Sequence, residues 1–204
     1  MNSLTNHMAD SYNNKAVERD TFEVSKWKAK EREVFLQMLQ KERLYSLLEI
    51  GAGPGKDSLY FNENGLATIS TDLSPEMVRL CKEKGLDAKV MDFANLDAPD
   101  NYFDSVWAMN CLLHVPKDQI SDVLSEIKRV LKPTGLFFMG VYGGENSEGI
   151  WEDDFYTPKR FFSFFEDEGI KQLVSEYFTI EYFTVVPKDV VGGKFHFQSM
   201  ILRK

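Results

Sequence analysis

The chain has 204 residues, of which 43% are hydrophobic and 27% charged, a balance typical of one soluble globular domain. Its 24 basic and 32 acidic residues give a formal net charge of −8. Proteins that bind nucleic acids usually carry a basic stripe, and this sequence contains none, so we expect no nucleic-acid partner. The 16 phenylalanines, within an aromatic share of 13%, indicate a large core or an apolar pocket.

The cysteines and the apolar stretches bear on the compartment of the protein. Cys81 and Cys111 lack the C-x-x-C spacing, which favours reduced thiols in a cytoplasmic protein, and we predict no metal site. The polar segment Met1–Asn14 does not resemble a signal peptide. Ser105–Pro116, among the longest uncharged stretches, is too short for the roughly 20 residues that cross a bilayer. These features predict a soluble, cytoplasmic protein without a membrane partner.

The first part of the chain alternates helical and strand patterns. Residues 1–20 are polar and are expected to be loose or partly helical, and a helix is expected from Thr21, whose side chain can cap it. Leu44–Ile50 is a short apolar run that ends at glycines, as does a strand buried on both faces of a parallel sheet. The elements expected next are strand Leu66–Asp72, helix Pro75–Lys84 with Ser74 as its N-cap, and strand Leu86–Asp92.

The second part continues this alternation and then changes. The expected elements are strand Phe103–Asn110, helix Lys117–Leu131, strand Gly135–Tyr142, and a helix over Pro158–Asp167 that Gly169 ends. Glu176–Val186 and Phe195–Leu202 have no helical pattern between them, so they are expected to form an antiparallel pair of strands. The whole pattern predicts an α/β fold: a mostly parallel sheet with helices on both faces and a C-terminal antiparallel hairpin.

Glycines crowd the segment Glu49–Asp57, which joins the first expected strand to the next helix. They permit positive φ angles and let a ligand lie against bare backbone. In an open parallel sheet, ligands bind in the crevice at the carboxyl ends of the strands. Such turns also serve packing, but a position after a buried strand and before a helix favours a ligand-binding loop.

Acidic residues end the next two strands. Asp72 ends the second strand, where a carboxylate can accept hydrogen bonds from both hydroxyls of a ribose. Asp92 and Phe93 end the third strand, where the edge and face of an adenine would lie. Acids at strand ends also occur as caps, but three consecutive strands that each end in a glycine loop or an acid predict a ligand that contains adenosine.

The spacing of the glycines separates two classes of adenosine ligand. Dinucleotide sites use G-x-G-x-x-G and place the pyrophosphate at a helix N-terminus. Here Gly51, Gly53 and Gly55 follow the spacing G-x-G-x-G, and Asp57 would repel a phosphate at the start of the helix. A cofactor without phosphates, but with an α-amino group and a sulfonium, fits better. The loop therefore predicts S-adenosylmethionine.

At these residues the chain resembles the class I S-adenosylmethionine-dependent methyltransferases of the small single-domain type. The resemblance extends from about Tyr12 to the C-terminus. Five segments carry it: LLEIGAGPGKDSLYF, STDLSPEMVRLCKEKG, VMDF, FDSVWAMNCLLHVP and IKRVLKPTGLFFMGVY. It implies a Rossmann-like sheet of seven strands whose last two form an antiparallel pair.

The resemblance also implies roles for the matching residues. Asp72 would hold the ribose hydroxyls, and Leu73 and Met77 would pack on the adenine. Asn110 would lie near the methionine amino group or the transferred methyl, and Tyr12 would close over the cofactor. The full set of cofactor-binding positions implied is Tyr12, Glu49, Gly51, Ala52, Gly53, Gly55, Asp57, Asp72, Leu73, Met77, Asp92, Phe93 and Asn110.

The methyl acceptor is predicted from segments that follow the fourth and fifth strands. His114 can be a general base, a hydrogen-bond partner of the substrate, or a structural histidine. The segment 143–165 combines acidic and aromatic side chains. It is typical either of a solvated loop followed by a helix or of an apolar, electronegative pocket for a small amine or an aromatic compound. The candidate substrate residues are Tyr142, Trp151 and Glu152.

These observations predict an S-adenosylmethionine-dependent methyltransferase that transfers a methyl group in line to a small molecule, as a monomer or a homodimer. Two alternatives remain: an NAD-dependent oxidoreductase, in which Asp72 would hold the same ribose, and a non-catalytic S-adenosylmethionine-binding module. We expect a single domain over residues 1–204. It would comprise an N-terminal helical cap (1–43), a cofactor-binding core (44–143), and a substrate-side lid with the C-terminal hairpin (144–204).

Overall fold

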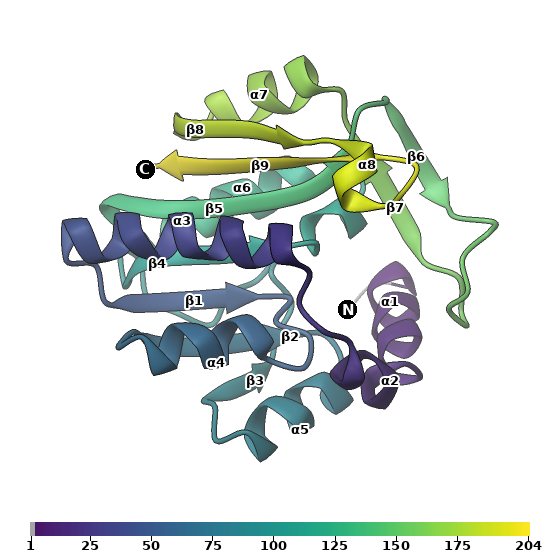
Figure 1. The fold of residues 1–204 in the computed structure, drawn as a ribbon, viewed down its shortest axis with the longest axis horizontal. Coiled ribbons are helices and arrows are strands. Elements are labelled where there is room, and N and C mark those ends of the chain that lie inside the picture. Colours follow the sequence, from purple (N-terminus) through teal and green to yellow (C-terminus); the bar gives the residue numbers. More distant parts are fainter. Residues whose placement is uncertain (1–2) are drawn as a thin grey trace.

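A seven-stranded sheet forms the centre of the molecule (Figure 1). The computed structural model describes residues 3–204; Met1 and Asn2, part of the segment expected to be loose or partly helical, lie outside the described residues. In spatial order the strands are β3 (Ala88–Val90), β2 (Ala67–Asp72), β1 (Ser46–Ile50), β4 (Phe103–Met109), β5 (Leu131–Gly143), β9 (His196–Arg203) and β8 (Thr179–Val186). Strands β3 to β5 are parallel, and β9 is antiparallel to both β5 and β8, which confirms the predicted fold class.

Helices cover both faces of this sheet (Figure 1). Helices α3 (Lys26–Glu42) and α4 (Lys56–Glu63) pack on one face, and α6 (Ile120–Val130) and α7 (Asp167–Ser175) pack on the other. Side chains alternate between the faces along each strand. In β4, Trp107 packs under α3 and stacks on Phe138 with ring centroids 3.9 Å apart, whereas Val106 faces α6. Both faces are therefore dry, which explains the continuous apolar runs in the strands.

The order of the strands determines where a crevice can form. From β1 the chain moves outward through β2 and β3, then returns to β4 on the other side of β1. The connections that leave β1 and β4 therefore run in opposite directions. Ligands of open α/β sheets bind at such a point, outside the carboxyl ends of the strands. Here the glycine loop follows β1 and Asn110 follows β4.

Two short N-terminal helices cross the carboxyl end of the sheet instead of packing on a face (Figure 1). These are α1 (Ser3–Asn13) and α2 (Ala16–Thr21), which contact α5 (Pro75–Glu83). They also contact the arm, our name for residues 144–165, which contains the hairpin of β6 (Ser147–Ile150) and β7 (Phe161–Phe164). The Ser11 hydroxyl donates to the Pro158 carbonyl at 2.6 Å, and Asn14 Nδ2 donates to the Thr157 carbonyl at 2.8 Å.

Three predictions about the helices are wrong. The helix expected over Pro158–Asp167 is instead strand β7, whose aromatic residues pair with β6. Gly169 does not end a helix but lies in the first turn of α7, where the acidic residues before it suit the helix dipole. Thr21 ends α2, and the next helix begins at Lys26, because residues 22–25 are extended or irregular.

The other predicted elements match the structure with shifted ends. The expected strand Leu86–Asp92 keeps only the three residues of β3. The helix expected from Lys117 begins at Ile120, after a short 3-10 turn, η1 (Leu112–His114). A short helix, α8 (Lys188–Val191), lies in the connection between β8 and β9. The carboxyl ends of the strands still lie at one edge of the sheet, although β3 ends at Val90, two residues before Asp92.

The N-cap of α5 allows a matched stability test. Ser74 Oγ accepts a hydrogen bond from the Met77 amide at 3.1 Å and donates one to Asn13 Oδ1 at 2.6 Å. Ser25 holds the same position in α3, but its side chain makes no cap hydrogen bond. We expect Ser74→Ala to lower the free energy of unfolding by about 1–2 kcal/mol, and Ser25→Ala by less than about 0.5 kcal/mol. Urea denaturation of both variants checks this, and equal losses would contradict it.

Candidate active site

A cavity opens at the carboxyl ends of β1 to β4, next to α1 and α2. It contains about 960 Å³ of space outside protein atoms, solvent at its mouth included. Nine residues expected from the sequence line this first chamber: Tyr12, Gly51, Gly53, Asp72, Leu73, Asp92, Phe93, Asn110 and His114.

The glycine loop approaches the first chamber as bare backbone. Gly51 and Gly53 have φ angles of +64° and +55°, which residues with a side chain rarely adopt. A Cβ atom on Gly51 would lie 2.3 Å from the Cys111 Cβ, so this glycine lets the end of β1 pack against the end of β4. A Cβ atom on Gly53 would meet no atom within 4 Å. Gly51 is therefore needed for packing, and Gly53 presents its backbone to open space.

Asp72 is held at the end of β2 by two backbone amides. Its Oδ2 accepts from the Gly53 amide at 2.8 Å, and its Oδ1 accepts from the Ser74 amide at 2.9 Å. Burial raises the pKa of Asp72, and the two backbone hydrogen bonds oppose this shift. Each carboxylate oxygen can accept a second hydrogen bond. The arrangement thus presents two fixed acceptors in the chamber wall, as a pair of vicinal hydroxyls requires.

The outer end of the first chamber is an apolar slot with a carboxylate at its edge. Asp92 follows β3, and its Oδ1 accepts from the Ala94 amide at 2.9 Å. Phe93 and Leu73 line the slot with Val115, which follows η1. Apolar walls with a few fixed polar groups are typical of small-molecule sites. This slot suits a flat base with a hydrogen-bond donor on its edge.

Asn110 marks the inner end of the chamber, directly after β4. It has a φ angle of +59°, a conformation that asparagine tolerates better than most residues, and its amide donates to the Gly140 carbonyl at 2.8 Å. Its buried side-chain Oδ1 has no hydrogen-bond partner in the part of the chain that the structure describes. A buried acceptor without a partner is costly. Its position suits an N–H group of a ligand.

Arg19, on α2, lines the chamber although the sequence analysis did not identify it. Its guanidinium carbon lies 5.3 Å from the centroid of the Tyr12 ring, and one guanidinium nitrogen donates to the Tyr156 hydroxyl at 2.8 Å. Its Nε is buried without a partner among residues 3–204. No local pattern marks Arg19 in the sequence, because α2 meets the glycine loop only in the folded chain.

Tyr12 and His114 connect α1 to the arm. The Tyr12 hydroxyl lies 2.6 Å from His114 Nε2 and 3.2 Å from the Arg160 guanidinium. His114 Nδ1 lies 2.6 Å from the Phe161 carbonyl, to which it can only donate. Nε2 of the neutral ring therefore accepts the hydrogen bond from Tyr12. Burial lowers the pKa of His114 to about 3, in agreement with a neutral ring.

These contacts leave His114 without a free nitrogen for a substrate proton. Arg160, which also contacts Tyr12, is fixed by two hydrogen bonds of 2.8 Å to the Asp154 carboxylate. We call Tyr12, His114, Asp154 and Arg160 the latch. Its geometry favours a structural role for His114, closing the chamber, over the role of a general base.

A second chamber adjoins the first on the other side of the glycine loop. It contains about 1000 Å³ of space outside protein atoms, solvent at its mouth included. The residues shared by both chambers are Arg19, Gly51, Gly53, Met109 and Asn110. The end of β5, the start of α3 and α8 complete the wall through Tyr142, Trp27 and Val191. Tyr142 is thus the one predicted substrate residue that lines a chamber.

Three comparisons relate this geometry to known proteins. A family model described as a methyltransferase domain matches residues 48–139. Phosphoethanolamine N-methyltransferase from Plasmodium falciparum is 24% identical over 152 residues, which cover 71% of this chain and 56% of that enzyme. The crystal structure of 1,6-didemethyltoxoflavin-N1-methyltransferase from Burkholderia thailandensis, with S-adenosylhomocysteine bound, has a TM-score of 0.72 and 21% identity, covering 100% of this chain and 91% of that one. The (4+2)-cyclase SpnF has a TM-score of 0.65 and 20% identity, covering 89% of this chain and 83% of that one.

The segment matched by the family model contains the glycine loop, Asp72, Asp92 and Asn110. These are the residues on which the resemblance was based, and the strand order with one antiparallel strand agrees with it. Residues 48–139 thus match a methyltransferase domain, and the fold resembles that of the Burkholderia methyltransferase structure. It spans about half the length of the Plasmodium methyltransferase.

The residues that line the first chamber fit S-adenosylmethionine. Asp72 would hold the two ribose hydroxyls, and Leu73 and Phe93 would flank the adenine. The unpaired Asn110 Oδ1 would accept a hydrogen bond from the methionine amino group, and the Arg19 guanidinium would meet the carboxylate. The chamber thus offers a counterpart to each polar group of S-adenosylmethionine.

Two residues expected to contact the cofactor lie away from both chambers. A Cβ atom on Gly55 would lie 2.6 Å from Leu86 Cδ1, so this glycine serves the packing of the loop against the end of α5. Met77 is fully buried and packs with Ala16 and Leu80 beneath Tyr12. It supports the chamber wall from behind, because its position in the first turn of α5 points it toward α2.

Glu49, Ala52 and Asp57 line the second chamber instead of the first. Glu49 accepts a hydrogen bond from the Ser58 hydroxyl, and burial raises its pKa well above the usual range. The hydrogen bond ties the end of β1 to α4 beneath the glycine loop. Asp57 accepts from Trp107 Nε1 at 3.1 Å, so its carboxylate supports the sheet.

Trp151 and Glu152 lie outside both chambers. Trp151 makes edge contacts with the rings of Phe162, Phe164 and Phe195. The Glu152 side chain is 81% exposed and pairs with Lys159 at 2.8 Å. In the structure the aromatic side chains pack on each other while the acid lies in solvent, so these two residues do not contribute to either chamber.

Residues 3–204 also bear on metal binding and on membrane insertion. They contain no group of three or more His, Cys, Asp or Glu side chains that could hold a metal ion. No helix in this range is long and apolar enough to cross a membrane. Cys81 and Cys111 are free and buried, and burial raises the pKa of both thiols.

The latch predicts a pH dependence of stability. His114 has a pKa of about 3 in the folded protein and about 6.5 in the unfolded chain. Between these values the unfolded chain binds one proton more, so stability falls as the pH is lowered. From pH 7 to pH 5 we expect the free energy of unfolding to fall by about 2 kcal/mol more in the wild type than in His114→Asn. Urea denaturation at both pH values measures this, and parallel pH profiles would contradict it.

Proposed function

We propose that the protein transfers a methyl group from S-adenosylmethionine to a small-molecule acceptor. The observation that carries the proposal is the pair of chambers that meet at Gly51 and Asn110. The first chamber has the polar groups for the cofactor. The second begins where the methionine part would end, and it is open for an acceptor.

The residues around this junction supply orientation rather than acid–base chemistry. S-adenosylmethionine carries a methyl group activated by a sulfonium, and its transfer is an in-line displacement. Such a reaction depends on alignment and on exclusion of water. Asn110 and the glycine loop would fix the donor, while α1, α2 and the latch cover the first chamber. No proton transfer through His114 is required when the acceptor atom has a free electron pair.

Several observations support a small acceptor. The second chamber is enclosed by α2, α3 and α8, and its size suits a compound of metabolite dimensions. The Plasmodium relative is named for phosphoethanolamine, and the Burkholderia structure holds 1,6-didemethyltoxoflavin, which are both small molecules. In this proposal residues 1–43 act as a helical cap, 44–143 as the cofactor-binding core, and 144–204 as the substrate side.

The fold alone does not imply methyl transfer, since a (4+2)-cyclase shares it. Consumption of the cofactor is therefore the direct test. Formation of S-adenosylhomocysteine in the presence of a small-molecule extract is expected to require the protein and the extract together. A cofactor that binds tightly but is never consumed would favour the non-catalytic binding module.

Asp72 provides the test of the cofactor site. We expect Asp72→Asn to weaken S-adenosylhomocysteine binding by about 10- to 100-fold, because the amide loses the charge and one acceptor for the ribose hydroxyls. Isothermal titration calorimetry measures both affinities. Asp87→Asn is the matched control, since Asp87 is exposed before β3 and lines neither chamber. It is expected to bind within about twofold of the wild type.

The same titration discriminates the oxidoreductase. The wild type is expected to bind S-adenosylhomocysteine and to give no comparable signal with NADH. Tighter binding of NADH would overturn the proposed function.

A further inference from the structure

The second chamber has an excess of positive charge. Arg19, Lys28 and Lys56 line it, and none of the three forms an ion pair with a carboxylate in the described part of the chain. Cations in partly buried positions are usually paired, because burial without a counter-charge is costly. Burial lowers the pKa of both Lys28 and Lys56, as this cost requires. An anion in the chamber would therefore be stabilised.

Acids that lie near these cations are already bound to other residues. The negative charge of Asp57 raises the pKa of Lys28, but the Asp57 carboxylate already pairs with Arg32 at 2.9 Å. The negative charge of Asp20 likewise raises the pKa of Lys56, but the Asp20 carboxylate already pairs with Lys84 at 2.8 Å. Neither carboxylate can serve the chamber without breaking an existing ion pair.

Two other acids line the second chamber, and neither neutralises it. The buried Glu49 accepts a hydrogen bond from Ser58, and its raised pKa favours the uncharged form. Glu23 lies at the exposed rim, where solvent screens its charge. The interior of the chamber thus remains cationic.

The three cations differ in the contacts that already occupy their charged groups. Lys56 Nζ donates to the backbone carbonyls of Arg19 and Phe22, so it ties α2 to the glycine loop. Arg19 lines both chambers, which places it beside the cofactor. Lys28 lines only the second chamber, and its contact there is the Trp27 ring, whose centroid lies 5.3 Å from Nζ. Lys28 is therefore the cation left for a second ligand.

The charge of the cofactor also leaves Lys28 available for a second ligand, an inference that rests on the proposed function. S-adenosylmethionine carries one carboxylate, one ammonium and one sulfonium, so its net charge is +1. Its carboxylate can neutralise Arg19 but not Lys28 as well. An acceptor in the second chamber then faces Lys28 and the sulfonium together, and both attract an anion.

Aromatic side chains form the rest of the acceptor wall. The Trp27 and Tyr142 rings meet edge to face with centroids 6.5 Å apart, and Phe22 lies at the rim. Such walls bind flat, unsaturated bodies. We propose that the methyl acceptor is a small aromatic or unsaturated compound with an anionic group, a carboxylate or a phosphate, and that Lys28 selects it. This acceptor has the opposite charge to the amine expected from Trp151 and Glu152.

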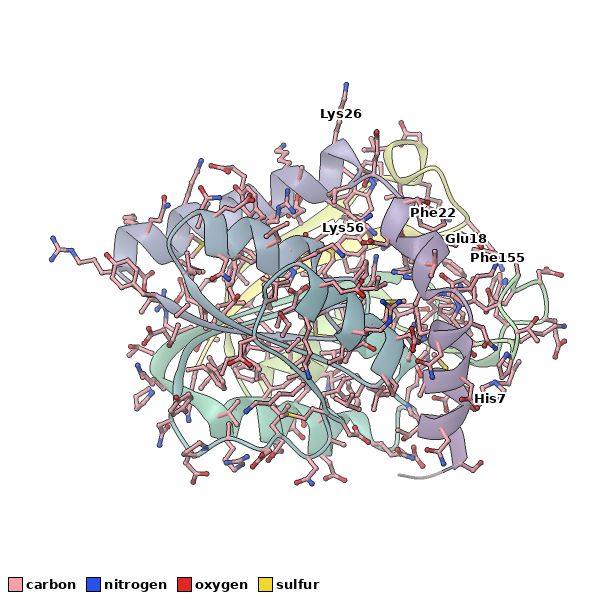
Figure 2. All side chains as sticks on the ribbon, turned by 90° about the horizontal axis from the view of Figure 1, so that it is seen from below. His7, Glu18, Phe22, Lys26, Lys56 and Phe155 are labelled. Atoms are coloured by element: carbon pink, nitrogen blue, oxygen red, sulfur yellow. The ribbon has the colours of Figure 1, made fainter. Side chains whose placement is uncertain are left out.

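Lys26 provides a matched control on the same helix. It precedes Lys28 by two residues, and Figure 2 shows its side chain extending away from the body of the protein, whereas Lys56 lies against the surface near Phe22. Lys26 is exposed and lines neither chamber. Lys26→Met and Lys28→Met therefore remove the same charge from the protein, but only Lys28→Met removes it from the acceptor wall.

The experiment uses calorimetry on the full chain saturated with S-adenosylhomocysteine. The probes are two pairs of equal shape, benzoate with benzamide and indole-3-acetate with indole-3-acetamide, and phenyl phosphate as the second anion. In the wild type at least one acid is expected to bind 10-fold or more tightly than its amide. Lys28→Met is expected to reduce that advantage to twofold or less, and Lys26→Met to retain it. A preference for phenyl phosphate over benzoate would assign the anion as a phosphate, and the reverse preference as a carboxylate.

The controls separate the failure of this inference from the failure of the proposed function. Lys28→Met is expected to keep its affinity for S-adenosylhomocysteine within twofold and its thermal midpoint near that of the wild type. If the wild type does not bind S-adenosylhomocysteine, the proposed function is wrong. If it binds but neither acid exceeds its amide and phenyl phosphate does not bind, or if the advantage survives in Lys28→Met, the anionic acceptor alone is overturned.

Discussion

The close contact between the ends of β1 and β4 is the constraint on which the site depends. Gly51 can take its φ of +64° against Cys111 only because it lacks a Cβ, and the Cys111 thiol donates to the Ile50 carbonyl at 3.2 Å. This contact lies where the chain changes direction along the sheet. It brings the glycine loop beside Asn110, so that one junction belongs to both chambers. A side chain at Gly51 would push the ends of β1 and β4 apart, and this would also disrupt the junction of the two chambers.

From this junction a chain of hydrogen bonds extends to the N-terminal helices. The Gly53 amide donates to Asp72, and the other oxygen of Asp72 accepts from the Ser74 amide. The Ser74 hydroxyl then donates to Asn13 at the end of α1. The Asp72 carboxylate, which is expected to hold the ribose, therefore also helps to hold α1 over the first chamber. A ligand that orders Asp72 would also order the docking of α1, because the same few atoms serve both.

The sequence predicts those parts of the site that depend on local pattern. Asp72 and Asn110 follow buried strands, and the carboxyl ends of neighbouring parallel strands necessarily lie together. Arg19 and Lys28 could not be found in this way, because they come from segments that approach the glycine loop only in the folded chain. The secondary structure of Phe161–Phe164 also cannot be predicted from local pattern, because its aromatic residues suit either a strand or a helix face. Pairing with β6 makes it a strand.

The electrostatics show why total charge is a poor guide to an acceptor. The protein carries −8, and its last segment is acidic, yet the acids that were expected to form an electronegative pocket are exposed or paired, as Glu152 is with Lys159. Solvent and counter-ions screen such charges within about 10 Å. Lys28 has neither a counter-ion nor full solvation, so its charge acts over a short distance in a less polar space. The sign of the field that an acceptor would meet therefore depends on the unpaired cations of the second chamber, Lys28 above all, and not on the sum over the chain.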